Sequence, residues 1–498
     1  MPQWSWIWGH LPLLRRYLAR YPSDVFFTYA LAGLAAEELP EADMFYLDLW
    51  PFSPPFLCIC DADAANQVSA KHTFPKSDYL RSLFEPLMGG PSLLTMNSQE
   101  WKDWRARFNP GFAHSYLLHH HLPAIVDYVD VFGAKLRERA ATGQVFPLEH
   151  LATRMTVDLI LKATLDDDMD YQNTANPMVD VLRNLIRWAY LGNPLSHLNP
   201  FRPLMLKYYS GAMNRYIRRI LTDRLNEIKH GQGTAALQTS KSIIALVYQI
   251  RLFLFAGHDT TTGSLIYTYH FLSQHPDILR RLQDEHTMIF GEDPASASAL
   301  LKQNPNLLNQ LPYTTAVIKE TMRLYPVSGS IRSGVRGATL TDRHGTHYPT
   351  EGFHLLNVHP AIQSSPRVWP RPLEFLPERW LAAPGDELYP HNAAGAWRPF
   401  EQGPRNCIGQ NLSLIEMRVA LALTVRAVRI EPAYEEWDAM KRGGGGSLSR
   451  LGWQKKATER RTLRGQWVYP IEKGSEASNA RDGYPCRVID LGSGGGRD

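Results

Sequence analysis

A short stretch near the C-terminal end of the chain combines a cysteine with residues that suit a reactive thiolate. The stretch WRPFEQGPRNCIGQNLSLIEMR (397–418) holds Cys407, one of four cysteines, with Arg405 before it and an apolar helical pattern after it. Cations and helix N-termini lower the pKa of a thiol, so we expect Cys407 to form a stable anion. Gly403 and Gly409 permit tight turns and the close approach of a bulky planar group. These residue types favour a thiolate that faces a flat partner.

A long apolar segment, FLFAGHDTTTGSLIYTYHFL (253–272), is interrupted by small and polar residues. On a helix, Ala256, Gly257 and Thr260 share one face, against which a flat group can lie. Asp259 places an acid beside the Thr260 hydroxyl. Two interpretations stay open for this pair: a proton route into a dry pocket, or a threonine that bonds back to the carbonyl four residues earlier beside a surface aspartate.

Two further segments contain charged residues at helical spacing. In KETMRLYP (319–326), Glu320 and Arg323 are three residues apart, and Arg379 in LPERW (376–380) could complete a charge triad with them. An exposed helix pair contributes only about 0.3–0.5 kcal/mol, so this spacing alone carries little weight. In EWKDWRARF (100–108), Trp101 and Arg105 are four apart on one helical face, and the arginine fork suits a carboxylate.

The cysteine stretch carries the most specific pattern in the chain. Phe400, Gly403, Arg405, Cys407 and Gly409 form FxxGxRxCxG, and at ordinary residue frequencies a chance match in a chain of this length has a probability on the order of 10⁻⁴. With the motifs above, the sequence resembles the cytochrome P450 family over residues 4 to 490. The resemblance implies a mainly α fold with a small β region, an α-rich triangular prism in which haem is buried between the long central helix and the cysteine loop.

The same resemblance assigns roles to the motif residues. It makes Cys407 the axial thiolate of the haem iron, Asp259 and Thr260 the acid and alcohol that relay protons, and Glu320, Arg323 and Arg379 the triad that fixes the loop core. It places Arg105, Arg405 and Arg332 (in SIRSGV) at the haem propionates. The remaining haem-site positions that it implies are Phe400, Gly403, Gly409, Trp101, Ala256 and Gly257.

The resemblance also implies an activity, its cofactors and its partners. We expect a monooxygenase that uses heme b and O2 to insert one oxygen atom into an apolar small molecule, with electrons from NADPH through cytochrome P450 reductase and a possible contribution from cytochrome b5. By resemblance, 76–96, 176–210 and 327–331 line the substrate pocket. The segments FLFAGHDTT and GPRNCIGQNL resemble the corresponding segments of filamentous-fungal enzymes of secondary metabolism, including enzymes of polyketide mycotoxin pathways.

Two other classes of function remain open. One is a haem-thiolate isomerase or dehydratase that needs no outside electrons, against which the intact Asp259–Thr260 pair argues. The other is a non-catalytic haem-binding or sensor protein, because a fold resemblance does not certify activity. A requirement for NADPH and reductase distinguishes a monooxygenase from the isomerase or dehydratase. Turnover of any substrate distinguishes an enzyme from the non-catalytic haem-binding protein.

The N-terminal residues suit a membrane surface or a packed helix. Trp4, Trp6 and Trp8 precede several leucines and arginines in MPQWSWIWGHLPLLRRYLARYP. This mixture favours either the membrane interface or an amphipathic helix on the core. No stretch offers the roughly 18 apolar residues of a spanning helix. With the resemblance, this predicts a peripheral protein on the cytosolic face of the endoplasmic reticulum membrane.

Composition bounds the remaining choices. Of 498 residues, 44% are hydrophobic and 20% charged, which is ordinary for a globular protein and argues against disorder or a membrane bundle. The net charge of +4 is small and spread along the chain, so we expect no nucleic-acid partner. We expect a monomer with an interfacial segment over 1–22, one catalytic domain over 23–475, and a C-terminal strand and flexible tail over 476–498.

Apolar periodicity predicts where helices and strands lie. Two short strands are expected within 44–61, where Cys58 and Cys60 would face the same side, and a hairpin is expected over 343–358. The expected helices are 101–108, 122–140, 147–165, 176–190, 204–230, 242–273, 275–290, 308–325 and 410–429.

Overall fold

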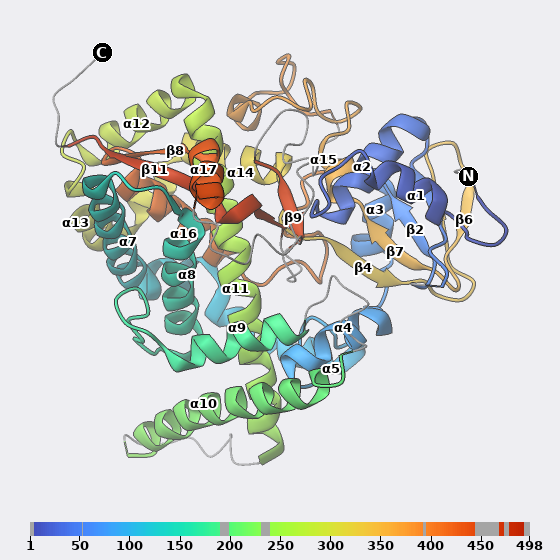
Figure 1. The fold of residues 1–498 in the computed structure, drawn as a ribbon, viewed down its shortest axis with the longest axis horizontal. Coiled ribbons are helices and arrows are strands. Elements are labelled where there is room, and N and C mark those ends of the chain that lie inside the picture. The colour runs from blue at the N-terminus through green and yellow to red at the C-terminus, as the bar shows by residue number, and fades with distance from the viewer. Residues whose placement is uncertain are drawn as a thin grey trace.

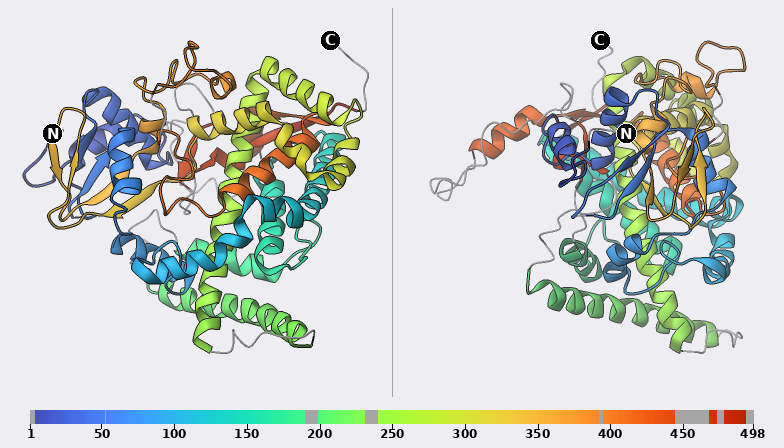
Figure 2. Two further views of the ribbon diagram at one scale, coloured as in Figure 1. Left: turned by 180° about the vertical axis from the view of Figure 1, so that it is seen from behind. Right: turned by 90° about the vertical axis from the view of Figure 1, so that its right-hand side faces the viewer.

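The computed structural model describes residues 4–51, 53–189, 199–230, 240–391, 395–443, 468–472 and 478–492. Its longest helix, α11 (Ser240–Gln274), passes through the centre of the molecule. Helices α7, α8 and α16 lie on one side of it and the largest sheet lies on the other (Figure 1). The view from behind in Figure 2 shows the same division. The flexible tail expected at the C-terminal end falls on 493–498, outside the described residues.

The bounds of the helices and strands complete the description. The α-helices are α1 (Leu11–Leu18), α2 (Phe27–Glu38), α3 (Ala62–Asn66), α4 (Asp78–Met88), α5 (Ser98–Phe108), α6 (His114–Tyr116), α7 (Leu122–Thr142), α8 (Leu148–Leu165), α9 (Pro177–Ala189), α10 (Arg202–His230), α11, α12 (Pro276–Phe290), α13 (Ser296–Gln303), α14 (Pro312–Leu324), α15 (His359–Gln363), α16 (Gln410–Thr424) and α17 (Tyr434–Gly443). The strands are β1 (Met44–Leu47), β2 (Phe56–Ile59), β3 (Phe146–Pro147), β4 (Ser330–Ser333), β5 (Thr339–Thr341), β6 (His347–Pro349), β7 (His354–Asn357), β8 (Val428–Pro432), β9 (Pro470–Glu472), β10 (Ser478–Ala480) and β11 (Pro485–Asp490).

The crossing of α8 and α11 explains one residue of the central motif. Gly257 lies where α11 meets α8, and a Cβ atom there would stand 2.6 Å from Cγ1 of Ile160. Glycine therefore lets two buried helices approach closely. Thr156 of α8 strengthens the contact, because its hydroxyl donates to the His258 carbonyl at 3.0 Å and lies 2.9 Å from the Thr262 hydroxyl. The main hydrophobic core surrounds this crossing.

The largest sheet has the order β1-β2-β7-β4, with β2 and β7 parallel. The strands expected within 44–61 are confirmed as β1 and β2, and Cys58 and Cys60 are both buried in one core cluster. The hairpin expected over 343–358 is wrong. Its first strand, β6, pairs with β5, whereas its second, β7, pairs with β2 and β4. A local pattern marks strands but does not choose between long-range partners.

The expected helix over 410–429 is too long. Helix α16 ends at Thr424, and Val428 begins a strand that pairs with β11. Along that strand Val428 and Ile430 are buried while Arg429 is exposed. This alternation of buried and exposed residues has the period of a strand. The apolar residues at the end of α16 continue directly toward the strand, so the predicted helix extended through it.

The N-terminal segment contains the packed amphipathic helix, which was one of the two alternatives, beside exposed tryptophans. Helix α1 packs Leu13, Leu14 and Tyr17 against the core, whereas Trp4, Trp6 and Trp8 are exposed, Trp6 at 85%. In the described part of the chain, none of the helices has the length and apolar character needed to cross a bilayer.

Candidate functional site

The cysteine loop closes on itself before α16 begins. The Cys407 backbone N–H donates to the Phe400 carbonyl at 2.8 Å, so the six residues between them form a compact turn. Gly403 adopts φ +80°, and a Cβ atom there would collide with the Ser69 carbonyl. Gly409 has an ordinary φ of −80° and is the N-cap of α16. The turn therefore requires glycine at 403, whereas at 409 the absent side chain leaves space beside the Cys407 sulfur, 3.8 Å from where a Cβ would stand.

Burial dominates the electrostatics of Cys407. Cys407 is exposed only in the sense that it lines the cavity, and protein atoms surround its thiol. Burial raises the pKa of Cys407, although the backbone N–H of Gly409, the charge of Arg105 and the backbone N–H of Gln410 act to lower it. The expected lowering by a nearby cation and by the start of the helix is present, but in the protein without a bound metal ion desolvation outweighs it. A metal ion bound to the sulfur would supply the charge that removes the proton.

The wall opposite the cysteine comes from the middle of α11. Ala256, Gly257, Asp259 and Thr260 line the same cavity as Cys407. The Thr260 hydroxyl donates to the Ala256 carbonyl at 2.8 Å, the back-bonded arrangement that was one of the two open interpretations. Asp259 is half-buried and accepts a hydrogen bond on Oδ1 from Nδ2 of Asn479 at 3.1 Å. Both side chains therefore border the cavity although Thr260 is back-bonded.

Apolar side chains line much of the rest of the cavity. They come from the segments before and after α5, from α11 and from the segment before β4, and they include Leu93, Leu94, Phe112, Leu252, Phe253, Phe255 and Val327. The expected contributions from 76–96 and 327–331 are present. The described residues of 176–210 are not among those that line the cavity. Residues 190–198 of that range are outside the described residues.

Three arginines converge on one edge of the cavity without a carboxylate partner. Arg105, Arg332 and Arg405 all line it, and no carboxylate of the described residues lies within ion-pairing distance of them. Nε and Nη1 of Arg332 and Nε of Arg405 are buried with no hydrogen-bond partner in the described part of the chain. Burial, with the charges of Arg332 and Arg105, lowers the pKa of Arg405 to about 9. This edge is therefore suited to a ligand with negative charge.

Neighbours orient two of these arginines. Arg105 donates from Nη1 to the Asn406 carbonyl at 2.8 Å and from Nη2 to Asn406 Oδ1 at 3.0 Å. Arg405 donates to Asn97 Oδ1 at 2.7 Å and to the Met96 carbonyl, and its guanidinium lies 4.7 Å from the ring centroid of Trp101. Arg105 and Trp101 of α5 thus contact the two residues that precede Cys407 in the loop.

The predicted charge triad forms a fully buried network. Arg323 donates to both carboxylate oxygens of Glu320 at 2.9 Å, and Arg379 donates to Glu320 Oε1 at 2.9 Å. Trp380 Nε1 donates to Glu320 Oε2 at 3.0 Å, and the Leu376 backbone N–H to Oε1 at 3.1 Å. The Arg323 guanidinium also donates to the carbonyls of Gln363 and Pro372, both at 2.7 Å. The network therefore ties α14 to the segment that precedes the cysteine loop.

A second polar network beside the loop was not predicted. Arg398 donates to Glu401 Oε2 at 2.5 Å, and Glu401 Oε1 contacts His359 at 3.0 Å and Asn357 at 2.7 Å. Burial acts to raise the pKa of Glu401, but His359, the charge of Arg398 and Asn357 hold it well below its usual range. The sequence signal was the pair of opposite charges in WRPFE, which looked no different from a surface pair.

Glu416 is a second acid that sequence reasoning missed. It lies on the inner face of α16, lines the cavity, and burial raises its pKa to about 8 despite a hydrogen bond with Thr261. An acid within the apolar run LSLIEMRVALAL was the available signal.

The site as a whole fits a haem group. A thiol beside a helix N-terminus faces small side chains of a helix across the cavity, and guanidinium groups with unpartnered nitrogens border one edge. Haem offers an iron that binds thiolate, a flat ring and two propionates. The residues present therefore match the donor set and the charge of that cofactor.

Comparison with known proteins decides the family. The family model for cytochrome P450 matches residues 43–451. This chain belongs to the cytochrome P450 family of haem-thiolate monooxygenases. The family and fold class predicted from the sequence are confirmed, and membership implies haem, O2 and electrons from a redox partner.

Relatives and solved structures agree over nearly the whole chain. It is 34% identical to cytochrome P450 monooxygenase polC of Polytolypa hystricis, over 98% of this chain and 89% of that protein. It is 33% identical to cytochrome P450 monooxygenase acrF of Aspergillus aculeatus, over 79% of this chain and 86% of that protein. The crystal structure of the cytochrome P450DA heme domain shares the fold, with a TM-score of 0.73 at 18% identity, covering 98% of this chain and 96% of that one.

Proposed function

We propose that this P450 inserts one oxygen atom into an apolar small molecule of fungal secondary metabolism, such as a polyketide-derived mycotoxin precursor. The observation that carries the proposal is the cavity, in which the Cys407 thiol lies opposite Ala256 and Thr260 and the substrate space is walled by leucine and phenylalanine. The fungal relatives named monooxygenases support it. They favour it over an isomerase, a dehydratase or a haem-binding protein without turnover.

In this proposal the residues around the cavity hold the cofactor and the substrate. Cys407 holds the iron of heme b, while Arg105, Arg332 and Arg405 bind the propionates beside Trp101 and Phe400. When bound, thiolate-ligated haem supplies dioxygen reduction and O–O bond cleavage. Electrons come from NADPH through cytochrome P450 reductase, with cytochrome b5 as a further donor.

Asp259 and Thr260 move protons in this proposal. Dioxygen reduction consumes protons in a cavity whose apolar walls exclude bulk water, so a side chain must carry them inward. The Thr260 hydroxyl can turn from the Ala256 carbonyl toward the cavity, and the Asp259 carboxyl can then replace the proton that Thr260 gives up. Glu320, Arg323 and Arg379 act indirectly, by holding the loop that carries Cys407.

The proposal also covers the place of the enzyme in the cell. We propose a monomer that lies on the cytosolic face of the endoplasmic reticulum membrane through residues 1–22, followed by a catalytic domain over 23–475 and a C-terminal segment over 476–498. The exposed tryptophans beside α1 support this placement, because indole rings favour the membrane interface. A liposome-binding assay with endoplasmic reticulum lipids tests this membrane contact. We expect the parent protein to bind more strongly than a variant with Trp4→Ser, Trp6→Ser and Trp8→Ser.

The decisive experiment combines a spectrum with turnover. We expect the reduced carbon monoxide complex of the purified protein to give the red-shifted Soret band of a thiolate ligand, and Cys407→Ala to lose it. We expect NADPH oxidation to require reductase, and Thr260→Ala to divert electrons into hydrogen peroxide. An imidazole-type spectrum of the parent protein would contradict the ligand, and turnover without NADPH would favour the isomerase or dehydratase.

A further inference from the structure

The first half of α11 holds a chain segment that leads into the cavity wall. Figure 1 shows α4 and α10 beside the lower end of α11, where this helix begins. The segment 87–94 (the wall segment) starts in the last residues of α4 and continues toward α5. Leu93 and Leu94, at its far end, line the cavity that contains Cys407. The contacts that hold the wall segment therefore also place part of the cavity wall.

Gln249 of α11 makes two hydrogen bonds with the wall segment. Its Oε1 accepts from the Leu93 backbone N–H at 2.8 Å, and its Nε2 donates to the Pro91 carbonyl at 3.3 Å. Gln249 is fully buried, so water cannot replace either bond. Leaving a buried backbone group unpaired is unfavourable, and the side chain therefore fixes where these two groups lie.

Arg251 holds the other end of the wall segment and joins it to a third helix. Its guanidinium donates to the Leu87 carbonyl, to Ser210 Oγ at 2.8 Å and to Asn214 Oδ1 at 2.9 Å. Ser210 and Asn214 are four residues apart on α10. Arg251 is 1% exposed, so these bonds take the place of water around a buried cation. Helix α10 thus anchors the guanidinium from the side opposite the wall segment.

Two glycines let the wall segment approach α11 closely. A Cβ atom at Gly90 would collide with the ring of Tyr248, and one at Gly89 would collide with the guanidinium of Arg251. Gly89 also has φ +83°, which favours glycine. The backbone of the segment therefore rests directly on α11, and its path depends on the side chains that α11 presents to it.

We propose that Gln249 and Arg251 are positioning residues, which set the shape of the substrate cavity by holding the wall segment against α11. The proposal rests on the function proposed above, oxidation of an apolar molecule in this cavity. Neither Gln249 nor Arg251 is among the residues that line the cavity. They act through Leu93 and Leu94, because a ligand gains most from apolar side chains that are already ordered before it binds.

A role in stability alone predicts a different result. If the two residues only stabilise the fold, losing them affects all ligands of the cavity alike. If they place the wall, a ligand that extends into the cavity loses affinity and a ligand confined to the iron does not. Imidazole and 4-phenylimidazole make this comparison, because both bind haem iron through a ring nitrogen and only the second carries an apolar ring beyond it.

The test measures the dissociation constants of both azoles for the haem-loaded protein from the shift of the Soret band. Gln249→Met and Arg251→Met each remove the hydrogen bonds at nearly constant length. We expect each variant to weaken binding of 4-phenylimidazole about fivefold and to change binding of imidazole less than about twofold, because freed leucines must be ordered when the ligand binds. An unchanged ratio of the two constants in both variants overturns the proposal.

Tyr269→Phe is the matched control. It removes a buried contact of the same helix, since the Tyr269 hydroxyl lies 2.7 Å from the Thr424 hydroxyl, near the other end of α11. We expect this variant to lower the melting temperature and to leave the ratio of the azole constants unchanged. If it weakens 4-phenylimidazole as strongly as Gln249→Met does, general loosening of α11 explains the effect and the positioning role is wrong.

Hydrogen exchange tests the contact without an azole and without turnover. We expect Gln249→Met to speed amide exchange in peptides that cover 89–95 by about tenfold or more, because the Leu93 N–H loses its buried acceptor. Peptides from α8 should exchange as in the parent protein. Unchanged exchange over 89–95 means that Gln249 does not hold the wall segment in solution, and the proposal fails.

The parent protein separates failure of this inference from failure of the proposed function. If the parent forms no azole complex, the proposed haem site is wrong and this inference falls with it. If the parent binds both azoles and neither variant changes their ratio, the haem site stands and only the positioning role is wrong.

Discussion

Two clusters of buried arginines in this molecule differ in what balances their charge. In the paired cluster, Arg323 and Arg379 share the carboxylate of Glu320 and donate their remaining hydrogens to backbone carbonyls. In the cavity cluster, Arg105 and Arg405 contact amides, carbonyls and an aromatic ring, and no carboxylate of the described chain pairs with these two or with Arg332. The same type of side chain is therefore balanced by a carboxylate in one cluster and lacks such a partner in the described chain in the other.

The difference follows from the cost of burying charge. A buried ion pair is stable only when its hydrogen bonds are satisfied, and the paired cluster satisfies them within the protein. Arg332 and Arg405 keep buried nitrogens without a partner in the described chain, which is unfavourable for the protein alone and becomes favourable when an anion binds. We therefore expect substitutions in the two clusters to affect stability with opposite signs.

The largest effect is expected in the paired cluster. Glu320→Ala leaves Arg323 and Arg379 buried without a counter-charge, so we expect the free energy of unfolding to fall by about 3–5 kcal/mol. Urea unfolding followed by tryptophan fluorescence measures this fall, and the yield of haem-loaded protein should drop with it. A loss below about 1 kcal/mol would mean that the triad is not a structural link.

Glu416 is a buried acid without a cationic partner in the described chain, whereas the cavity arginines are buried cations without an acidic one. Glu416 has no cation of the described chain within ion-pairing distance, and its pKa is raised from 4.5 to about 8. Between about pH 5 and pH 8 the folded protein holds a proton that the unfolded chain releases, so stability falls as pH rises, by about 1.4 kcal/mol per pH unit. We expect Glu416→Gln to match the parent near pH 5 and to be more stable at pH 8. Urea unfolding at both pH values checks this, and equal pH slopes in the two proteins would contradict it.

A smaller effect of opposite sign is expected at the cavity. Arg332→Met replaces an incompletely partnered buried cation with an apolar side chain of similar length. We expect the haem-free protein to be unchanged or more stable by about 1 kcal/mol, while haem transfer to apomyoglobin becomes about tenfold faster. Destabilisation of the haem-free protein as large as that of Glu320→Ala would erase the distinction between the clusters.

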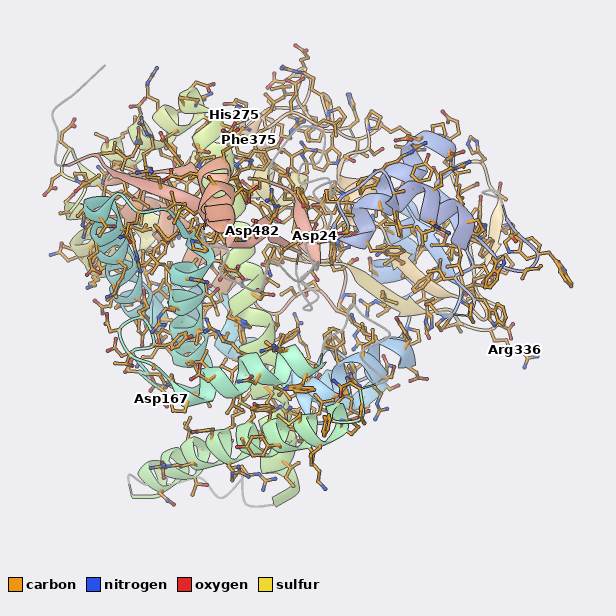
Figure 3. All side chains as sticks on the ribbon, viewed as in Figure 1. Asp24, Asp167, His275, Arg336, Phe375 and Asp482 are labelled. Carbon is orange, nitrogen blue, oxygen red and sulfur yellow. The ribbon has the colours of Figure 1, made fainter. Side chains whose placement is uncertain are left out.

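The smallest effect is expected at the surface. Arg336 and Glu351 form an ion pair at 3.6 Å, and Arg336, labelled at the edge of the molecule in Figure 3, is 91% exposed. Water and salt screen such a pair, so Arg336→Ala should change neither the melting temperature nor haem retention measurably. A clear loss of either would show that burial is not what distinguishes the two clusters.

Much of the site could be predicted because its spacing is local. Glu320 and Arg323 lie one helical turn apart, Ala256 and Thr260 share a helix face, and Cys407 immediately precedes a helix. The network of Arg398 and Glu401 was missed because its partners, Asn357 and His359, come from another part of the chain. The strand pairing of 347–349 and 354–357 was wrong for the same reason, since residues far apart in sequence supply the correct partners.

The sequence by itself determined the family, the helical character and the choice of Cys407 as the thiol of interest, because periodicity and motif spacing are properties of neighbouring residues. Tertiary structure alone decided which arginines are paired, the direction in which the pKa of Cys407 moves, and the contact between Asn479 and Asp259. Each of these depends on how densely distant segments pack around a charge, and desolvation of that charge is a property of the folded protein rather than of any short stretch of it.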